Sequence, residues 1–180
     1  RFDPVFTGSD PRDEFRKAPP LKLSALNLRL ANDGDTHLVG LSALPPRELG
    51  PGMEVRASLE GSSVRQPAQW NGRVYAEFGY TNLACWRAWV YYPLDVRRGE
   101  GALRIWATLT GGRITQGTAD VALSNVTTRL AKDLPVLEVS SVRGRVYGRE
   151  TARGYDFGVR SLALSSPGAP PMNATSFRAT

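Results

Sequence analysis

Polar and apolar residues alternate along most of this 180-residue chain, and a period of two is typical of β-strands. Short turns such as Asn32-Asp33-Gly34-Asp35 and Gly111-Gly112 separate the runs, so neighbouring strands are expected to pair antiparallel. The strands are predicted at Leu21–Ala31, Thr36–Leu44, Met53–Glu60, Trp70–Tyr80, Gly101–Leu109, Arg113–Ser124, Asn125–Lys132 (a short strand or a connector), Leu137–Tyr147, Arg153–Val159 and Ser161–Leu164, with a last one from Asn173.

The alternation changes phase inside the first strand and again inside a later one. Leu21 and Leu23 occupy odd positions, whereas the apolar residues from Leu26 onward occupy even ones. The segment Leu137–Val146 aligns with Leu21–Leu30 without gaps and shows the same change. A β-bulge absorbs such a slip and bends the strand. A recurring bulge predicts a strongly curved sheet with one continuous apolar face; the alternative is a chance likeness of two β-rich segments.

Helical spacing occurs in one place. Apolar residues three and four positions apart predict one short α-helix near residues 82–91, with Thr81 or Asn82 as its N-cap and Pro93 as its end. The expected fold class is therefore mainly β: a strongly curved, mostly antiparallel sheet, shaped as a β-groove, with one short α-helix.

The two ends of the chain differ in composition. Residues 1–20 are rich in proline and are interpreted as a connector, with a short strand at Asp3–Phe6. Residues 21–180 are interpreted as one curved antiparallel segment. No run approaches the ~20 apolar residues of a membrane helix. The chain begins at Arg1 without Met or a signal peptide, so we interpret it as a segment of a longer protein that carries any anchor elsewhere.

The charge is positive, and arginine supplies most of it. A formal net charge of +6 suits acidic partners such as phosphate, phospholipid headgroups or an acidic protein, but charge alone favours plain solubility as its explanation. One hairpin is especially basic, and its arginines favour a solvated outer face over a contact with anionic headgroups or nucleic acid: Arg143, Arg145, Arg149, Arg153 and Arg160.

The residues needed for catalysis or metal binding are sparse. His37 is the single histidine, and no nucleophile motif lies near it. Together with Cys85, the single cysteine, it offers too few ligands for a metal site, and no glycine-rich phosphate loop is present. We therefore expect no catalytic residues, no metal and no cofactor, and predict that the protein is not an enzyme. Cys85 is expected to be a small buried apolar residue.

Three stretches are more specific than simple alternation: "APPLKLSALNLRLANDGDTHLVGLSALPPREL", a long one that begins "ACWRAWVYYPLDVRRGEGALRIW", and "YDFGVRSLALSSPGAPPMNATSFR". Together they resemble the YhdP family, large AsmA-like proteins of Gram-negative bacteria. The most specific part is "WRAWVYYPL" followed by "GEGALRIW" and "LTGGRIT…ADVALSNV", and the likeness covers most of Pro19–Arg178. The remainder is alternating β sequence of a kind that many β proteins contain.

The resemblance implies a non-enzymatic segment of a periplasmic bridge-type protein, anchored in the inner membrane. Such a segment would hold phospholipid acyl chains in an apolar β-groove for transport between the inner and outer membranes, and would adjoin neighbouring β-groove segments of the same chain. The family offers no motif to carry over residue by residue. The candidate lipid-binding residues therefore come from the alternation: Leu26, Leu28, Leu30, Val74, Ala76, Phe78, Leu103, Ile105, Ala107, Leu109, Val121, Leu123, Val142 and Val146.

Two other functions remain open at this point. A structural or protein-binding β module of the cell envelope would use its edge strands or the basic hairpin. In that case the same apolar residues would form a closed core. A single-stranded nucleic-acid binder would use Trp70, Trp86, Trp89 and Trp106 for stacking, but the two tryptophans in the helical stretch are expected to pack on the sheet instead. No nucleic-acid partner is therefore expected.

Overall fold

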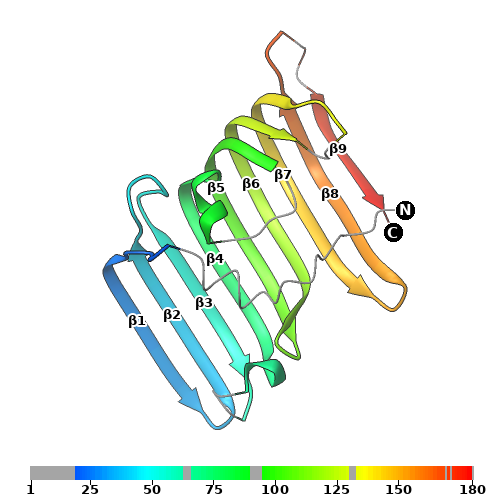
Figure 1. Ribbon diagram of the computed structural model, residues 1–180. Helices are drawn as coiled ribbons and strands as arrows, with labels where there is room; N and C mark the ends of the chain where they lie inside the picture. Colours follow the sequence, from blue (N-terminus) through cyan, green and yellow to red (C-terminus); the bar gives the residue numbers. More distant parts are fainter. Residues whose placement is uncertain are drawn as a thin grey trace.

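The computed structural model describes residues 19–62, 66–89, 95–129, 133–168, 170 and 172–179. These residues form one sheet of nine strands in simple up-and-down order, and every neighbouring pair is antiparallel (Figure 1). The prediction of a mainly β, antiparallel fold is confirmed. The strands are β1 (Ser24–Asp33), β2 (Thr36–Leu44), β3 (Met53–Glu60), β4 (Asn71–Asn82), β5 (Asp95–Thr110), β6 (Arg113–Arg129), β7 (Leu137–Thr151), β8 (Gly154–Ser165) and β9 (Met172–Ala179).

Several strands are longer than their alternation predicts. β5 begins at Asp95 because that residue and Val96 pair with Arg129 and Thr128 at the far end of β6. The stretch predicted as a separate strand or connector after Ser124 is thus the continuation of β6. Pairing with a long neighbour supplies backbone hydrogen bonds where the local pattern is weak. The strand expected at Asp3–Phe6 lies outside the described residues.

The α-helix predicted near residues 82–91 is wrong. The described part of this segment holds only a four-residue 3-10 turn, η2 (Cys85–Ala88). The predicted N-cap is also wrong, because the residue before the turn is Ala84 and no side chain caps it. Asn82 lies two residues earlier, and its side-chain oxygen accepts a hydrogen bond from the backbone N–H of Ala84 at 3.1 Å. Bulky aromatic side chains lose rotamer freedom in a helix, and so short a segment forms too few hydrogen bonds to offset nucleation. A second such turn, η1 (Pro67–Gln69), precedes β4.

The phase changes correspond to residues with left-handed backbone. Ala25 has a φ of 46°, and the pairing of β1 with β2 shifts between Ser24 and Asn27, so the first predicted bulge is confirmed. In the second copy the location differs: the extra residue lies on β8, at Ser161, where φ is 53°. Asn125 of β6 adopts a φ of 52° in the same way.

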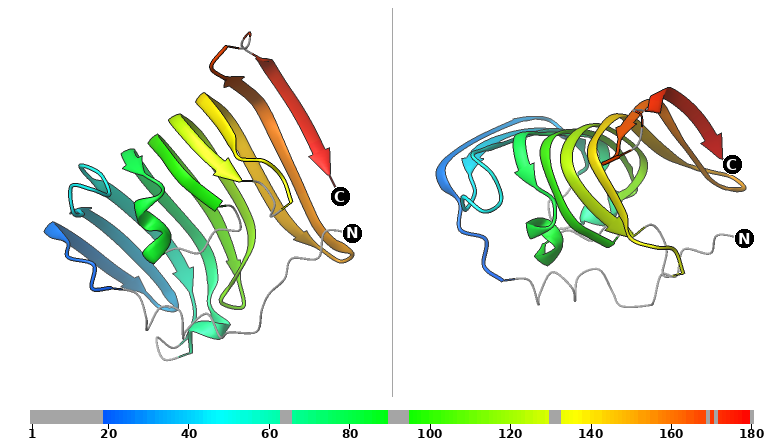
Figure 2. Two further views of the ribbon diagram at one scale, coloured as in Figure 1. Left: turned by 45° about the horizontal axis from the view of Figure 1, so that its top comes forward. Right: turned by 90° about the horizontal axis from the view of Figure 1, so that it is seen from above.

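These three residues share one sequence context. An apolar residue stands two positions before each and another one position after, as in Leu123–Asn125–Val126 and Val159–Ser161–Leu162. A left-handed residue rotates the following strand, so both apolar side chains stay on one side of the sheet. All three lie toward the end of the sheet from which β1 starts, where the strands bend over (Figure 2).

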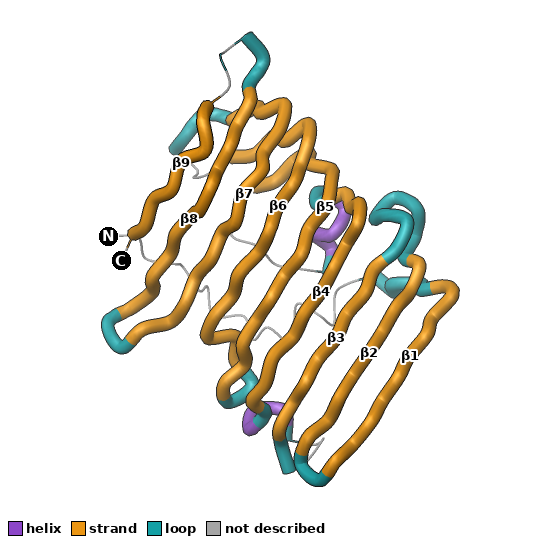
Figure 3. The backbone as a smooth tube through the Cα atoms, turned by 180° about the vertical axis from the view of Figure 1, so that it is seen from behind, coloured by secondary structure: helices purple, strands orange, loops and turns teal. Residues whose placement is uncertain are grey.

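The sheet is open and less curled than the sequence predicts. β1 and β9 lie at opposite edges and do not pair with each other. Seen from behind, the strands lie side by side and no described helix crosses that face (Figure 3). Burial is confined mainly to the bent end, where η2 and the loop after β2 supply a small core. Its buried apolar side chains include Ala43, Leu49, Trp86, Val96, Val126 and Val139.

Candidate functional site

The strand register gathers apolar side chains from all nine strands on one face, here called the apolar face. Residues opposite each other on paired strands point to the same side of a sheet. One such row contains Leu28, Leu41, Val55, Ala76, Ile105, Ala119, Val146, Val159 and Phe177. The next row contains Leu30, Val39, Ala57, Val74, Ala107, Gly117, Gly148, Phe157 and Ala179.

All fourteen residues predicted from the alternation lie on this apolar face, because each belongs to these rows or stands two or four residues from a member. Their contact with a ligand stays a prediction. Sequence reasoning missed equivalent residues on β2, β3, β8 and β9, namely Leu41, Val55, Val159 and Phe177, and also Ala119 on β6. The same period of two in those strands would have found them.

The apolar face is largely uncovered within the described part of the chain. Leu28 on β1 and Phe177 on β9 are 52% and 57% exposed, and the residues of the central strands are half-buried. At the bent end η2 packs on this face: the Trp86 ring meets the Phe78 ring edge-on, with centroids 5.5 Å apart. Trp89 follows at 6.1 Å from Trp86. A continuous exposed apolar surface of this kind marks a contact with another molecule.

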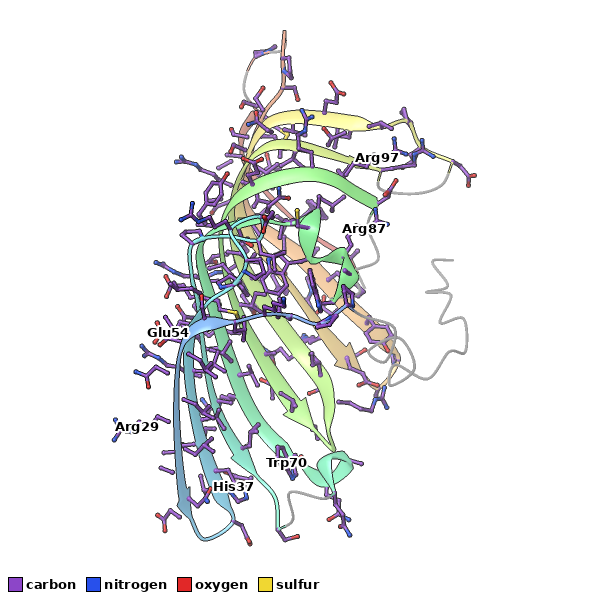
Figure 4. The ribbon with its side chains drawn as sticks, turned by 60° about the vertical axis from the view of Figure 1, so that its left-hand side comes forward. Arg29, His37, Glu54, Trp70, Arg87 and Arg97 are labelled. Carbon is purple, nitrogen blue, oxygen red and sulfur yellow. The ribbon has the colours of Figure 1, made fainter. Side chains whose placement is uncertain are left out.

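The opposite face, here called the polar face, carries ion pairs in place of apolar rows. Arg29 and Glu54 project from it, away from His37 and Trp70 (Figure 4). Cross-strand pairs join Arg104 Nε to Glu77 at 2.9 Å and Arg145 Nη2 to Asp120 at 2.7 Å.

These hydrogen bonds favour the charged carboxylates of the polar face. The pKa of Glu77 is lowered first by the hydroxyl of Tyr75 and then by Arg104. The pKa of Asp120 is lowered by Arg145. Both carboxylates are therefore ionised at neutral pH, and this side of the sheet remains hydrated.

His37 has a structural role at the turn between β1 and β2. Its Nε2 lies 2.9 Å from the carbonyl oxygen of Gly61 and its Nδ1 lies 2.8 Å from Oδ1 of Asn32. Because a carbonyl only accepts, Nε2 donates to Gly61. The ring also stacks on Trp70 at 6.1 Å. Among the described residues no group of His, Cys, Asp and Glu could hold a metal ion. Cys85 is half-buried beside Trp86 in η2.

The geometry thus consists of an uncovered apolar face backed by a charged one. A family model described as YhdP protein matches residues 12–179. The chain belongs to the YhdP family. No curated protein and no solved structure matches it significantly. YhdP-family proteins are generally non-enzymatic transport proteins, and membership implies a protein of the cell envelope.

The YhdP family assignment covers nearly the whole described sheet, from before β1 to the end of β9. The apolar face is therefore a property of the family segment itself rather than of an added domain. No helix in the described residues is long and apolar enough to cross a bilayer.

Proposed function

We propose that the apolar face binds the acyl chains of phospholipids, as one segment of a periplasmic protein that transports them between the inner and outer membranes. The observation that carries this proposal is the pair of apolar rows that runs in register across nine strands, with no second layer over most of it among the described residues. A soluble protein normally buries such a face against a second sheet or helices. Acyl chains are the partner whose chemistry matches it most fully.

The free energy of apolar burial allows the apolar face to hold an acyl chain and still let it slide. Each methylene removed from water contributes ~0.8 kcal/mol, so a partly buried chain is held firmly. Apolar contact has no preferred direction, and therefore a chain can slide from one row to the next without breaking specific bonds. Across nine strands about 4.8 Å apart the face extends for roughly 38 Å. The charged headgroup stays in water at the rim.

The two edges of the sheet suit continuation into neighbouring segments. All ten residues of β1 are exposed, and in the described residues nothing pairs with its outer edge or with that of β9. Unpaired N–H and C=O groups along an edge recruit another strand. We therefore place neighbouring β-groove segments of the parent chain at these edges, with the membranes reached through that parent, which an inner-membrane helix would anchor.

Site-specific photocrosslinking in growing cells tests the acyl-chain contact. A photoreactive phenylalanine analogue at Ile105 points to the apolar face, whereas the same analogue at Thr108 on the same strand points to the polar face. Both positions are half-buried, so they are matched in access. After irradiation of the whole protein in the cell envelope, mass spectrometry should show phospholipid attached at Ile105 and not at Thr108.

Two outcomes would reject this function. Equal labelling at both positions would mean nonspecific contact with lipid. Protein adducts at Ile105 without lipid would mean that the apolar face is closed by a polypeptide, which is the structural and protein-binding alternative. That alternative is favoured only by the exposed β1 edge, whereas acyl-chain binding accounts for the full width of the apolar face.

As a second measurement, Phe78→Asp or Ile105→Asp should release phospholipid that co-purifies with the chain, as seen by native mass spectrometry with lipid extraction. A charge introduced among apolar side chains expels acyl chains because burying it is costly. Thr108→Asp, on the opposite face, is the control and should retain the lipid.

A further inference from the structure

Two adjoining hollows lie on the polar face, opposite the acyl-chain surface. The first, of ≈ 740 Å³, runs over β1 to β6. The second, of ≈ 410 Å³, runs over β6 to β9. Gln116 and Thr118 of β6 line both, so the two hollows adjoin at β6 and together run across the sheet. We call the pair the arginine trough.

Side-chain size explains why an otherwise even sheet is hollow here. Gly40, Ser42 and Ser58 leave a low floor on β2 and β3. On β4 and β5 the rings of Tyr75 and Trp106 stand beside it, 5.5 Å apart and tilted by 47°. The contrast between small and large side chains on neighbouring strands therefore contributes to the depression.

Positive charge dominates the trough. Three arginines and one glutamate line the first hollow, and four arginines and one aspartate line the second. Some of this charge is neutralised internally, since Asp156 accepts from Arg149 at 2.8 Å and from Arg178 at 2.7 Å. The arginines that meet no carboxylate of the described residues are Arg29, Arg73 and Arg160.

Aromatic rings also line the arginine trough. Tyr75, Trp106, Thr118 and Tyr147 stand opposite one another on four successive strands. Arg145 lies over the Trp106 ring at 5.6 Å, and Arg160 lies over the Tyr147 ring at 5.2 Å. Such stacking holds the guanidinium groups at the surface. Arg145 gives its donors to Asp120, whereas Arg160 meets no carboxylate among the described residues.

We infer that the arginine trough binds an extended acidic segment of a protein. Arg, Trp and Tyr together are the residues that dominate protein–protein binding energy, and the excess of cations selects carboxylates, which arginine can grip with two hydrogen bonds. A trough of roughly 38 Å takes about eleven residues of extended chain at about 3.3 Å each. A phospholipid headgroup suits it poorly, because this face offers no apolar rows for the attached acyl chains.

A fluorescein-labelled peptide of twelve glutamates is the probe, with binding to the full chain followed by fluorescence anisotropy at about 0.1 M salt. Arg73→Gln and Arg160→Gln should each weaken binding by about three- to fivefold, the upper range for one exposed ion pair. Neither change breaks an ion pair between described residues. Arg47→Gln removes the same charge at an exposed position of the loop after β2 and should leave the affinity within twofold.

Three results would overturn the assignment. Absence of binding would remove the site. Equal loss in the Arg47→Gln control would mean that only net charge matters. If inorganic polyphosphate binds with sensitivity to Arg73→Gln and Arg160→Gln while the peptide does not, the trough recognises a phosphorylated polyanion and not a protein segment. All three readouts are independent of lipid, so the acyl-chain proposal stands or fails separately.

Discussion

Replacing Thr81 by Val removes one hydroxyl from the buried node that joins the bent end of the sheet to η2. The Thr81 side chain is 1% exposed. Its Oγ1 donates to the carbonyl of Leu49 at 2.8 Å and accepts from Nε1 of Trp86 at 2.7 Å. Valine has nearly the same shape, so the packing remains and the hydrogen bonds alone are lost.

The magnitude follows from what each partner keeps. The Leu49 carbonyl still accepts from the backbone N–H of Asn82 at 3.1 Å, so it keeps one of its two hydrogen bonds. The indole N–H of Trp86 loses the partner that faces it in the buried node. An unsatisfied buried donor costs about 1–3 kcal/mol, and this sets the expected loss in the free energy of unfolding for Thr81→Val.

Urea denaturation followed by tryptophan fluorescence measures this loss, with Thr81→Ser as the matched variant. Serine keeps the hydroxyl and loses a methyl group, at a cost of about 1 kcal/mol. We therefore expect valine to destabilise more than serine. If valine were as stable as the parent chain while serine were the weaker variant, methyl packing would hold this node and the hydrogen-bond argument would be refuted.

Two further predictions concern the backbone and pH. Gly101 has a φ of 148°, and a Cβ there would lie within 2.1 Å of the Ala122 carbonyl oxygen, so Gly101→Ala should cost about 1–3 kcal/mol in urea denaturation. Gly117→Ala, in open space, should cost less than half of that loss. The pKa of Asp156 is lowered chiefly by Arg178, so its contribution is complete above about pH 4 and is lost as pH falls through the folded pKa. Accordingly, Asp156→Asn should destabilise the chain at pH 7, and the gap to the parent should narrow toward pH 2; a constant gap would contradict this.

The sheet was predictable because alternation is a local property. Side chains on a strand point to opposite faces whatever lies nearby, so Val74, Ala76 and Phe78 could be grouped before any pairing was known. The short turn at Gly111-Gly112 likewise indicates an antiparallel neighbour. The candidate apolar residues on β1 and on β4 to β7 needed nothing more.

The predictions of the helix and of the second bulge failed because contacts with other strands determine the structure at these two places. Helical spacing of Leu83 and Trp86 predicted a helix, yet the indole N–H of Trp86 bonds to Thr81 on β4, and this contact favours a tight turn. The second bulge was assigned to the strand that shows the phase change, whereas the left-handed residue is Ser161 on its partner β8. No local pattern distinguishes which of two paired strands absorbs an extra residue.

The sequence by itself determined that this chain is a meander of antiparallel strands with one apolar side, because both features depend on neighbours within a few residues. Only the tertiary structure decided that nine strands align their apolar rows in a single register and that little packs on them. It also placed the arginines of six different strands around one trough. Such arrangements depend on cross-strand contacts between residues far apart in the chain, and these form only when the whole sheet has assembled.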